Sequence, residues 1–308
     1  MEAIEEFVGQ TRVGEPVSFR NLTVFPLIYA GDKGPDYAIL NEAMSLGEAE
    51  VSELEEGESV PTLVVRNKGD RSVLILAGQG LEGGLQNRTV NTSILADIGE
   101  TRIPVSCVEQ GRWERSSDFC SRDFAHSSLR SLMLVHTSHS LRTTRTFHSE
   151  QSEVWDEISR LSDSTNSPSE TGSLYESFSK FEETVKEYEK PLERLGSCHG
   201  VLVGVNGRIV GMDMLSREDP FEKVRSRLLR SYIVEAMEKT NGTKTCPADA
   251  AQSFLEGLGR AKTTPFPSCS LGTDMRWETN DLQASALVHQ DHVVHLMAFR
   301  RKRFSPFD

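Results

Sequence analysis

The chain has little of what marks several protein classes. Its five cysteines are odd in number and scattered, with no C-x-x-C pair. That pattern is typical of reduced thiols in the cytoplasm and excludes a disulfide framework or a zinc knuckle. No apolar run approaches the roughly 20 residues that a membrane-spanning helix needs. The acidic first residues also lack a signal peptide's basic start and apolar middle. The sequence therefore predicts a cytoplasmic protein with no membrane partner.

Basic charge is also scarce. The 308 residues hold 34 Lys and Arg against 46 Asp and Glu, a net charge of −12. This balance weighs against general affinity for nucleic acid or anionic membranes. The run Arg300–Arg303 is the local exception, and short basic ends of this kind are usually solvated. We therefore expect no nucleic-acid partner, while the oligomeric state is left open.

Apolar spacing predicts an α+β fold with strand-rich N- and C-terminal parts around a helical middle segment. Residues 1–308 are expected to form a single domain with one composite core, and the polar residues 162–172 a mobile serine-rich surface loop. Strands are expected at 17–30, 62–67, 73–77, 89–95, 103–109, 200–205, 208–212, 284–289 and 292–299, and helices at 151–161, 174–195, 220–239 and 248–258. The turn signals at 67–71 and at Asn206-Gly207 each predict a hairpin.

A glycine-rich turn follows the apolar run 73–77. Its spelling, Gly78-x-Gly80-x-x-Gly83, matches a dinucleotide-binding fingerprint. That fingerprint needs a helix to open at the glycines. The residues from 88 to 95 are rich in β-branched and turn types, which favour strand–turn–strand. The sequence thus predicts a hairpin, whose glycines either serve a ligand site or only shape the turn.

Polar donors follow these glycines directly. Backbone N–H groups in such turns can form a concave anion site, and Arg suits carboxylate or phosphate capture. A second polar block, residues 106–113, comes two short apolar runs later. Together the blocks predict a ligand pocket built on strand ends. Its candidate ligand-binding residues are Gly83, Gly84, Gln86, Asn87, Arg88, Asn91 and Trp113.

These blocks resemble a known family. The pattern Leu81-x-Gly83-Gly84-x-Gln86-Asn87-Arg88, then Asn91-Thr92-Ser93 and the stretch 103–113, is similar to the ADP-ribosylglycohydrolase- and rhodanese-phosphatase-associated protein domain family. Weaker similarity extends from about Val17 to Phe299. The resemblance implies a domain of uncharacterised activity, tied by association to NAD and ADP-ribose metabolism. It carries information about pathway and none about chemistry.

The second block supplies the candidate catalytic residues Glu109, Cys107 and Arg112. Cys107 and Glu109 alternate on the expected strand and so share a face. Glu109 could act as a general base and Cys107 as a nucleophile, with Arg112 stabilising charge. The alternatives are a Glu109–Arg112 ion pair and an inert buried thiol. Trp113 could stack on a base or ribose or could anchor the core.

The other polar residues give weaker evidence for a functional site. His289, His292 and His295 would not converge on one face of a strand, so no metal site is predicted. For Asp213, Asp274 and Arg276 a surface ion pair is the expected role. No cofactor is indicated.

Two functions remain open. The first is a protein that binds, and could process, a nucleotide or sugar phosphate of the NAD or ADP-ribose type. As an enzyme it would be a hydrolase or group transferase acting at a ribose or phosphate centre. The alternative is a non-catalytic scaffold or regulatory protein whose motif residues are structural.

Overall fold

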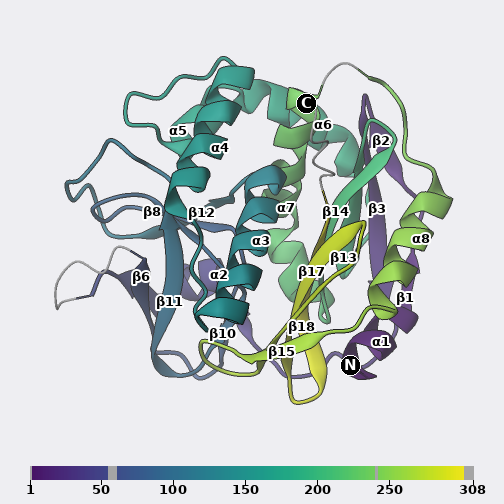
Figure 1. The fold of residues 1–308 in the computed structure, drawn as a ribbon, viewed down its shortest axis with the longest axis horizontal. Helices are drawn as coiled ribbons and strands as arrows, with labels where there is room; N and C mark the ends of the chain where they lie inside the picture. The colour runs from purple at the N-terminus through teal and green to yellow at the C-terminus, as the bar shows by residue number, and fades with distance from the viewer. Residues whose placement is uncertain (1, 55–60, 240–241, 302–308) are drawn as a thin grey trace.

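Three β-sheets and a group of helices make up the fold. The computed structural model describes residues 2–54, 61–239 and 242–301, and within them eight helices and eighteen strands (Figure 1). Strands fill the N- and C-terminal parts, and helices α3 to α6 lie between them in the sequence. This confirms the predicted α+β class.

The largest sheet is antiparallel and joins both ends of the chain. Its strands run in the order β1-β3-β13-β14-β18-β17-β16-β15, with β2 against β3. Their bounds are β1 Thr11–Val13, β2 Val17–Phe19, β3 Leu22–Tyr29, β13 Gly200–Val205, β14 Arg208–Leu215, β15 Thr264–Pro267, β16 Thr273–Glu278, β17 Leu282–His289 and β18 His292–Arg300. The register pairs Leu202 with Phe25, so strands far apart in sequence are neighbours.

Both faces of this sheet are covered by helices. Along β13, Val201 and Val203 pack into the cluster that contains α7 (Glu218–Glu238), while Leu202 packs into the cluster of α1 (Glu2–Gly9) and α8 (Ala248–Gly259). Successive side chains of a strand point to opposite faces, so a strand covered on both sides is apolar throughout. Figure 1 shows α1 and α8 on one side of the sheet and α3 and α7 on the other.

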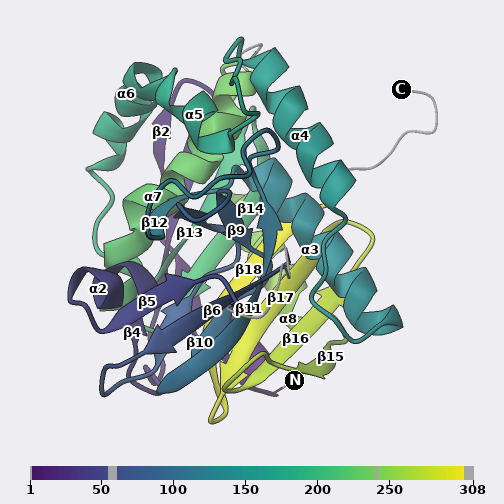
Figure 2. The ribbon, with the colours of Figure 1, turned by 90° about the vertical axis from the view of Figure 1, so that its left-hand side faces the viewer.

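Two smaller sheets carry the polar motifs. A six-stranded sheet has the order β12-β8-β9-β11-β6-β5, and a three-stranded one the order β10-β7-β4. The bounds are β4 Ala38–Ile39, β5 Ala49–Ser52, β6 Thr62–Asn67, β7 Val73–Ile75, β8 Gln79–Glu82, β9 Arg88–Val90, β10 Ile94–Ala96, β11 Gly99–Cys107 and β12 Cys120–Phe124. Figure 2 shows β5, β6 and β11 side by side at the front.

The helical middle differs in detail from the prediction. Its helices are α3 Ser127–Thr143, α4 Gln151–Ser164, α5 Leu174–Ser179 and α6 Glu182–Leu192, while α2 spans Leu40–Ser45. Helix α4 thus includes the first residues of the serine-rich segment. The expected helix 174–195 breaks in two. Before the break, Ser177 and Ser179 bond to backbone carbonyls through their hydroxyls, which competes with helix continuation. No described helix has both the length and the apolar character to cross a membrane.

The hairpin predictions have mixed outcomes. Strands β8 and β9 pair antiparallel across the glycine turn, and β13–β14 and β17–β18 also form hairpins. The hairpin predicted at 67–71 is wrong, because β6 pairs with β5 and β11 while β7 pairs with β10 and β4. Asn67 directs this turn: its side-chain nitrogen donates to the Arg71 and Asp97 carbonyls, so the chain passes from one sheet to another. The expected strand 89–95 likewise divides into β9 and β10.

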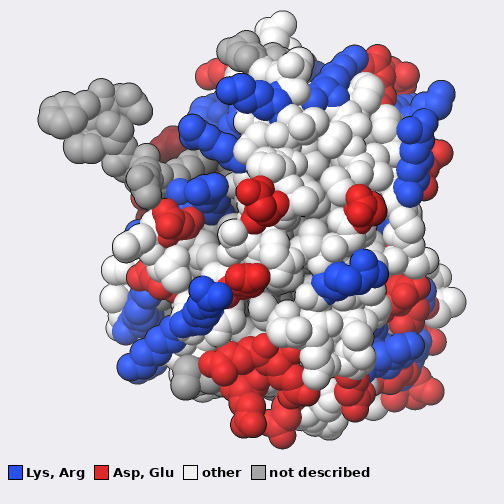
Figure 3. All heavy atoms as spheres, turned by 90° about the vertical axis from the view of Figure 1, so that its right-hand side faces the viewer, with Lys and Arg blue, Asp and Glu red and all other residues white. Residues whose placement is uncertain are grey.

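Surface charge is distributed unevenly. On the face that carries α1 and α8, acidic side chains gather toward the lower edge (Figure 3). Figure 1 places α1 at that edge, and its Glu2, Glu5 and Glu6 are exposed. This agrees with the acidic balance of the whole chain.

Candidate functional site

The glycine turn between β8 and β9 is closed by the protein itself. Gly83 and Gly84 have φ of 131° and 55°, values that favour glycine. A Cβ on Gly83 would lie 2.6 Å from the Asp118 carbonyl oxygen. The Gly83 N–H donates to Asn87 Oδ1 (3.1 Å), and the Gly84 N–H donates to the Ser117 carbonyl (2.9 Å). The turn therefore uses these donors to fix its own shape.

Asn87, Glu109 and Arg112 form one hydrogen-bonded cluster beside this turn. Glu109 Oε2 accepts from the Asn87 N–H (3.2 Å) and from Arg112 Nε (2.9 Å), and Oε1 accepts from Thr171 Oγ1 (2.8 Å). Arg112 also donates to Asn87 Oδ1 (3.1 Å) and to the Gly84 carbonyl (2.8 Å). The two sequence blocks thus meet in space.

The predicted strand 103–109 ends two residues early. Strand β11 ends at Cys107, so Glu109 lies past the point where strand alternation applies. The Val108 N–H still bonds to the Asn87 carbonyl (3.0 Å), which extends the β9–β11 register by one residue pair. Cys107 and Glu109 nevertheless contact different partners, since the thiol donates to Gln86 while the carboxylate accepts from Asn87, Arg112 and Thr171.

Glu109 is held as a carboxylate. Its burial favours the neutral form, but the hydrogen bonds from Arg112, Thr171 and the Asn87 N–H outweigh that effect, so its pKa lies below the usual range. An ionised carboxylate whose oxygens already accept several hydrogen bonds is a poor proton acceptor. This environment favours a role as a fixed negative charge over a role as a general base.

A cavity of about 730 Å3 opens beside the cluster. Asn87, Glu109 and Arg112 border it, together with residues of β8, β12, α5 and α6. Its other charged and aromatic lining residues are Glu82, Arg122, Asp123, Tyr175, Glu176, Phe178, Glu182 and Arg230. Each of its three arginines is in an ion pair: Arg112 with Glu109, Arg122 with Glu82, and Arg230 with acidic groups that include Glu182.

Gln86, Arg88 and Cys107 form a second, buried group, and the charges of Glu109 and Arg112 act on its Arg88. Gln86 Oε1 accepts from Arg88 Nη1 (3.0 Å) and from the Cys107 thiol (3.2 Å). Arg88 is 2% exposed, and its Nε has no hydrogen-bond partner. Burial lowers the pKa of Arg88 and raises that of Cys107, an effect that the Arg88 charge partly offsets. The thiol is therefore protonated and shielded from solvent.

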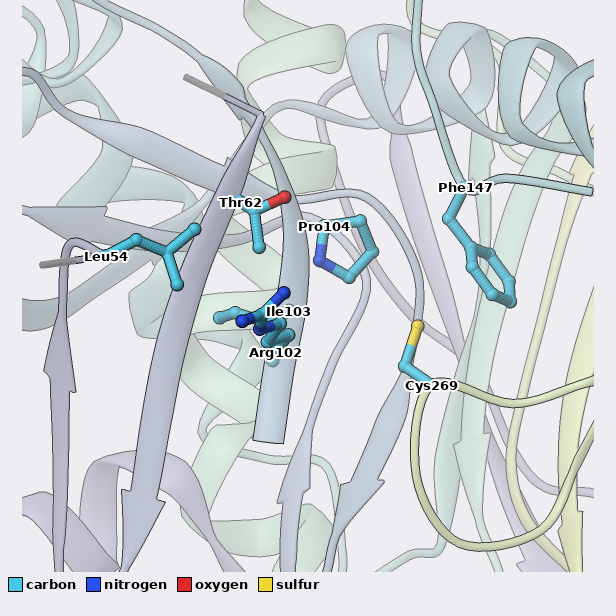
Figure 4. Close-up of a pocket in the computed structure, with 7 residues that line it drawn as sticks. All are labelled: Leu54, Thr62, Arg102, Ile103, Pro104, Phe147 and Cys269. Atoms are coloured by element: carbon cyan, nitrogen blue, oxygen red, sulfur yellow. The ribbon is translucent and has the colours of Figure 1, made fainter. Parts of the chain in front are cut away.

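Asn91 and Trp113 lie apart from both groups. Asn91 accepts from Ser106 Oγ (2.8 Å) and donates to the Phe147 carbonyl (2.9 Å). Phe147 borders a cavity of about 430 Å3, whose lining Figure 4 shows: Leu54, Thr62, Arg102, Ile103, Pro104, Phe147 and Cys269. Trp113 is half exposed and does not anchor the core. The predicted site residues therefore do not all lie in one pocket.

Asp213 is buried, which corrects the expectation of a surface ion pair. It is fully enclosed and pairs with Arg130 of α3 through both carboxylate oxygens, while Tyr232 donates to Oδ2 (2.6 Å). His295 Nε2 lies 3.3 Å from Asp213 Oδ1, and His295 Nδ1 lies 2.7 Å from Ser93 Oγ. These contacts form one buried hydrogen-bonded network, which runs from Ser93 through His295 and Asp213 to Arg130.

Asp274 and Arg276 are likewise buried rather than on the surface. They pair with each other, and Thr92 Oγ1 donates to Asp274 Oδ2 (2.8 Å) and accepts from Arg276 Nη2 (2.6 Å). Thr92 and Ser93 are adjacent, so their hydroxyls join two different buried ionic groups. The Asn91-Thr92-Ser93 segment thus contacts both buried groups.

Sequence reasoning missed Arg130 and Thr171. Arg130 could have been found, because it shares a helix face with Leu134 and Thr137, both buried, at spacings of four and seven. An Arg on an apolar face requires a buried partner. Thr171 gave no local signal, since it lies in a polar segment and reaches Glu109 only through the tertiary fold.

His295 lies apart from the other two C-terminal histidines, since His289 and His292 are register partners at the β17–β18 turn. His292 lies 3.5 Å from Asp32 near the surface, whereas His295 is buried against Ser93 and Asp213. Within residues 2–54, 61–239 and 242–301, no group of three His, Cys, Asp or Glu side chains is arranged to hold a metal ion.

Comparison with known proteins gives one match. The sequence profile of the ARG and Rhodanese-Phosphatase-superfamily-associated Protein domain matches residues 10–299. The match spans all three sheets and includes both polar blocks. No curated protein and no solved structure matches the chain.

Proposed function

Because the chain belongs to the ARG and Rhodanese-Phosphatase-superfamily-associated Protein domain family, we propose that it binds an NAD- or ADP-ribose-type nucleotide. The family is associated with ADP-ribosylglycohydrolase-related systems. The observation that carries the proposal is the Asn87–Glu109–Arg112 cluster, which joins the two sequence blocks at the edge of the 730 Å3 cavity. Cavities of about 300–1,000 Å3 are the usual size of small-molecule sites.

The lining suits the ribose and base of such a ligand. Five carboxylates face the cavity, and carboxylates accept hydrogen bonds from a ribose diol. Tyr175 and Phe178 of α5 supply aromatic surface at the same wall. Because every arginine there is already paired, the phosphates would contact the rim rather than a free cation.

Binding is favoured over chemistry at this site. Glu109, the candidate base, is ionised and fully hydrogen-bonded, and Cys107, the candidate nucleophile, is a shielded thiol in a different group. Hydrolysis or group transfer at a ribose or phosphate centre would need Glu109 to lose the Arg112 contact when substrate enters. Catalysis therefore stays a prediction, with Glu109, Arg112 and Cys107 as its candidate residues.

Calorimetry with NAD, ADP-ribose and ribose 5-phosphate tests the binding. Helix α6 offers a matched pair of variants, since Glu182 lines the cavity while Glu187 lies outside it and pairs with Arg20. We expect Glu182→Gln to weaken binding by about tenfold, or 1.4 kcal/mol. Glu187→Gln should leave binding unchanged. No heat with any of the three ligands at millimolar concentration would refute the proposal.

The alternative, a non-catalytic scaffold or regulatory protein, rests on a different observation. Asn87, Glu109 and Arg112 satisfy one another's hydrogen bonds, as structural residues do. For a scaffold, Arg88→Ala should lower the melting temperature sharply, and no nucleotide should bind. A variant that melts as the parent does, but has lost ligand affinity, would exclude this alternative.

A further inference from the structure

Another cavity lies elsewhere and is lined by different types of residue. Its volume is about 1,160 Å3, and it shares no lining residue with the 730 Å3 cavity. Its walls come from the start of α3, the β13–β14 hairpin, the end of α7, residues 242–244 and the end of β18. Asp281, just before β17, completes the lining, so segments that are distant in sequence meet around this cavity.

Its lining reverses the charge balance of the chain. Five basic residues face two acidic ones, although the chain as a whole has a net charge of −12. The basic residues are Arg208, Lys239, Lys244, Arg300 and Arg301. In the 730 Å3 cavity, by contrast, acidic residues outnumber basic ones. A cavity lined mainly by one sign of charge concentrates ions of the opposite sign.

Several of these cations have no ion-pair partner among the described residues. Lys239 is neutralised by Glu235 at 2.5 Å, and Arg301 donates to the Thr279 carbonyl at 3.1 Å. Arg208, Lys244 and Arg300 make no ion pair with any residue that the structure describes. All three are exposed, and they come from three different segments. Their charges are available to an incoming ligand.

The first turn of α3 adds to the positive potential in this cavity. Ser127, Ser128 and Ser131 line the cavity, and α3 is 17 residues long. The N-terminal end of a helix carries partial positive charge and favours anions. Ser127 already donates to Glu235, so the backbone dipole rather than this hydroxyl contributes. The helix end supports the cations and does not replace them.

We propose that this cavity binds a small molecule that carries a pyrophosphate or longer phosphate chain. Three unpaired cations match a ligand with several adjacent negative charges better than a single carboxylate or a monovalent ion. Lys and Arg are the side chains that bind phosphate oxygens. This inference does not depend on nucleotide binding at the 730 Å3 cavity.

The test is calorimetry of the full chain with inorganic pyrophosphate and, separately, with ATP. The Arg208→Ala/Lys244→Ala double variant should weaken pyrophosphate binding by about tenfold or more. The matched control is Arg12→Ala/Lys262→Ala, which removes the same charge at exposed positions outside the cavity. Its affinity should equal that of the parent. Binding should also weaken with added salt, because exposed charges are screened.

Three results would overturn the proposal. These are the absence of pyrophosphate binding at millimolar concentration, an equal loss in the control variant, and a single-stranded oligonucleotide that binds at this cavity far more tightly than ATP. Equal affinities for pyrophosphate and ATP would show that the cavity recognises the phosphates alone. Tighter binding of ATP would show that it also contacts the nucleoside. Glu182→Gln should not change pyrophosphate affinity, so the two cavities are tested separately.

Discussion

Ser93 Oγ lies 2.7 Å from His295 Nδ1, which ties the loop between β9 and β10 to the last strand of the large sheet across 202 residues of sequence. The Ala77 N–H also donates to Ser93 Oγ (3.0 Å), so the hydroxyl can donate its own hydrogen to the ring nitrogen. His295 Nε2 then faces Asp213. Although Ser, His and Asp are joined here, none of them lines a described cavity. The arrangement holds the fold together.

We expect Asp213→Asn to lower the free energy of unfolding by about 3–5 kcal/mol, because it leaves Arg130 buried without a counter-charge. Denaturant unfolding measures this loss. Glu50→Gln, which disrupts an exposed ion pair, is the control and should change stability much less. Equal effects of the two variants would contradict the buried network.

Stability should fall as the pH drops below about 6.5, the ordinary pKa of histidine. Burial lowers the pKa of His295 in the folded chain, so this histidine is neutral there but binds a proton once unfolded. Its contribution is therefore complete above that pH and is lost on acidification. His199, whose pKa is also lowered by burial, acts in the same direction.

Asp213 extends this loss to lower pH. Burial opposes its ionisation, but Arg130 and His295 hold its pKa well below the usual range, so its contribution declines below about pH 4. Unfolding measured from roughly pH 8 to pH 5 isolates the histidine effect. His295→Asn should flatten that slope without abolishing it, and an unchanged slope would count against His295.

Cys107 should resist alkylation. Burial and a raised pKa leave little thiolate at neutral pH, even though Arg88 lies nearby. Cys120 is exposed and serves as the internal control. Mass-spectrometric mapping after iodoacetamide treatment should find Cys120 modified first. Labelling of Cys107 at the same rate would show that its group opens to solvent and would revive the nucleophile hypothesis.

Gly83→Ala should destabilise the chain by more than about 1 kcal/mol, since its φ of 131° and the nearby Asp118 carbonyl leave no place for a methyl group. Gly9→Ala is the control, because nothing lies within 4 Å of its added Cβ. Melting curves compare the two. If Gly83→Ala were neutral, the turn would not be closed as described.

Local patterns predicted much of the secondary structure. Asn206-Gly207 is a turn whose dihedral preference is set by its own two residues, so the β13–β14 hairpin followed from sequence. The turn at Asn67 failed because its outcome depends on Asp97, which accepts a hydrogen bond from 30 residues away. Sheet membership is a tertiary property, and turn chemistry alone does not determine it.

In the candidate site, too, local contacts could be predicted from the sequence and tertiary ones could not. The pairing of Glu109 with Arg112 is local and was foreseen as an alternative to catalysis. The different partners of Cys107 and Glu109 were not foreseen, because Gln86 and Thr171 reach these two side chains only through the tertiary fold. The basic cavity was missed because its cations come from three segments that only the fold brings together.

The order of strands in the large sheet has a consequence for how the chain folds. Strand β3 is complete by residue 29, yet its neighbour β13 begins at residue 200. During synthesis one edge of β3 therefore has no partner strand until most of the chain has left the ribosome. Pairing at such long sequence separation is slow, because a large loop must close first. Chains truncated before residue 200 should therefore expose a strand edge and aggregate.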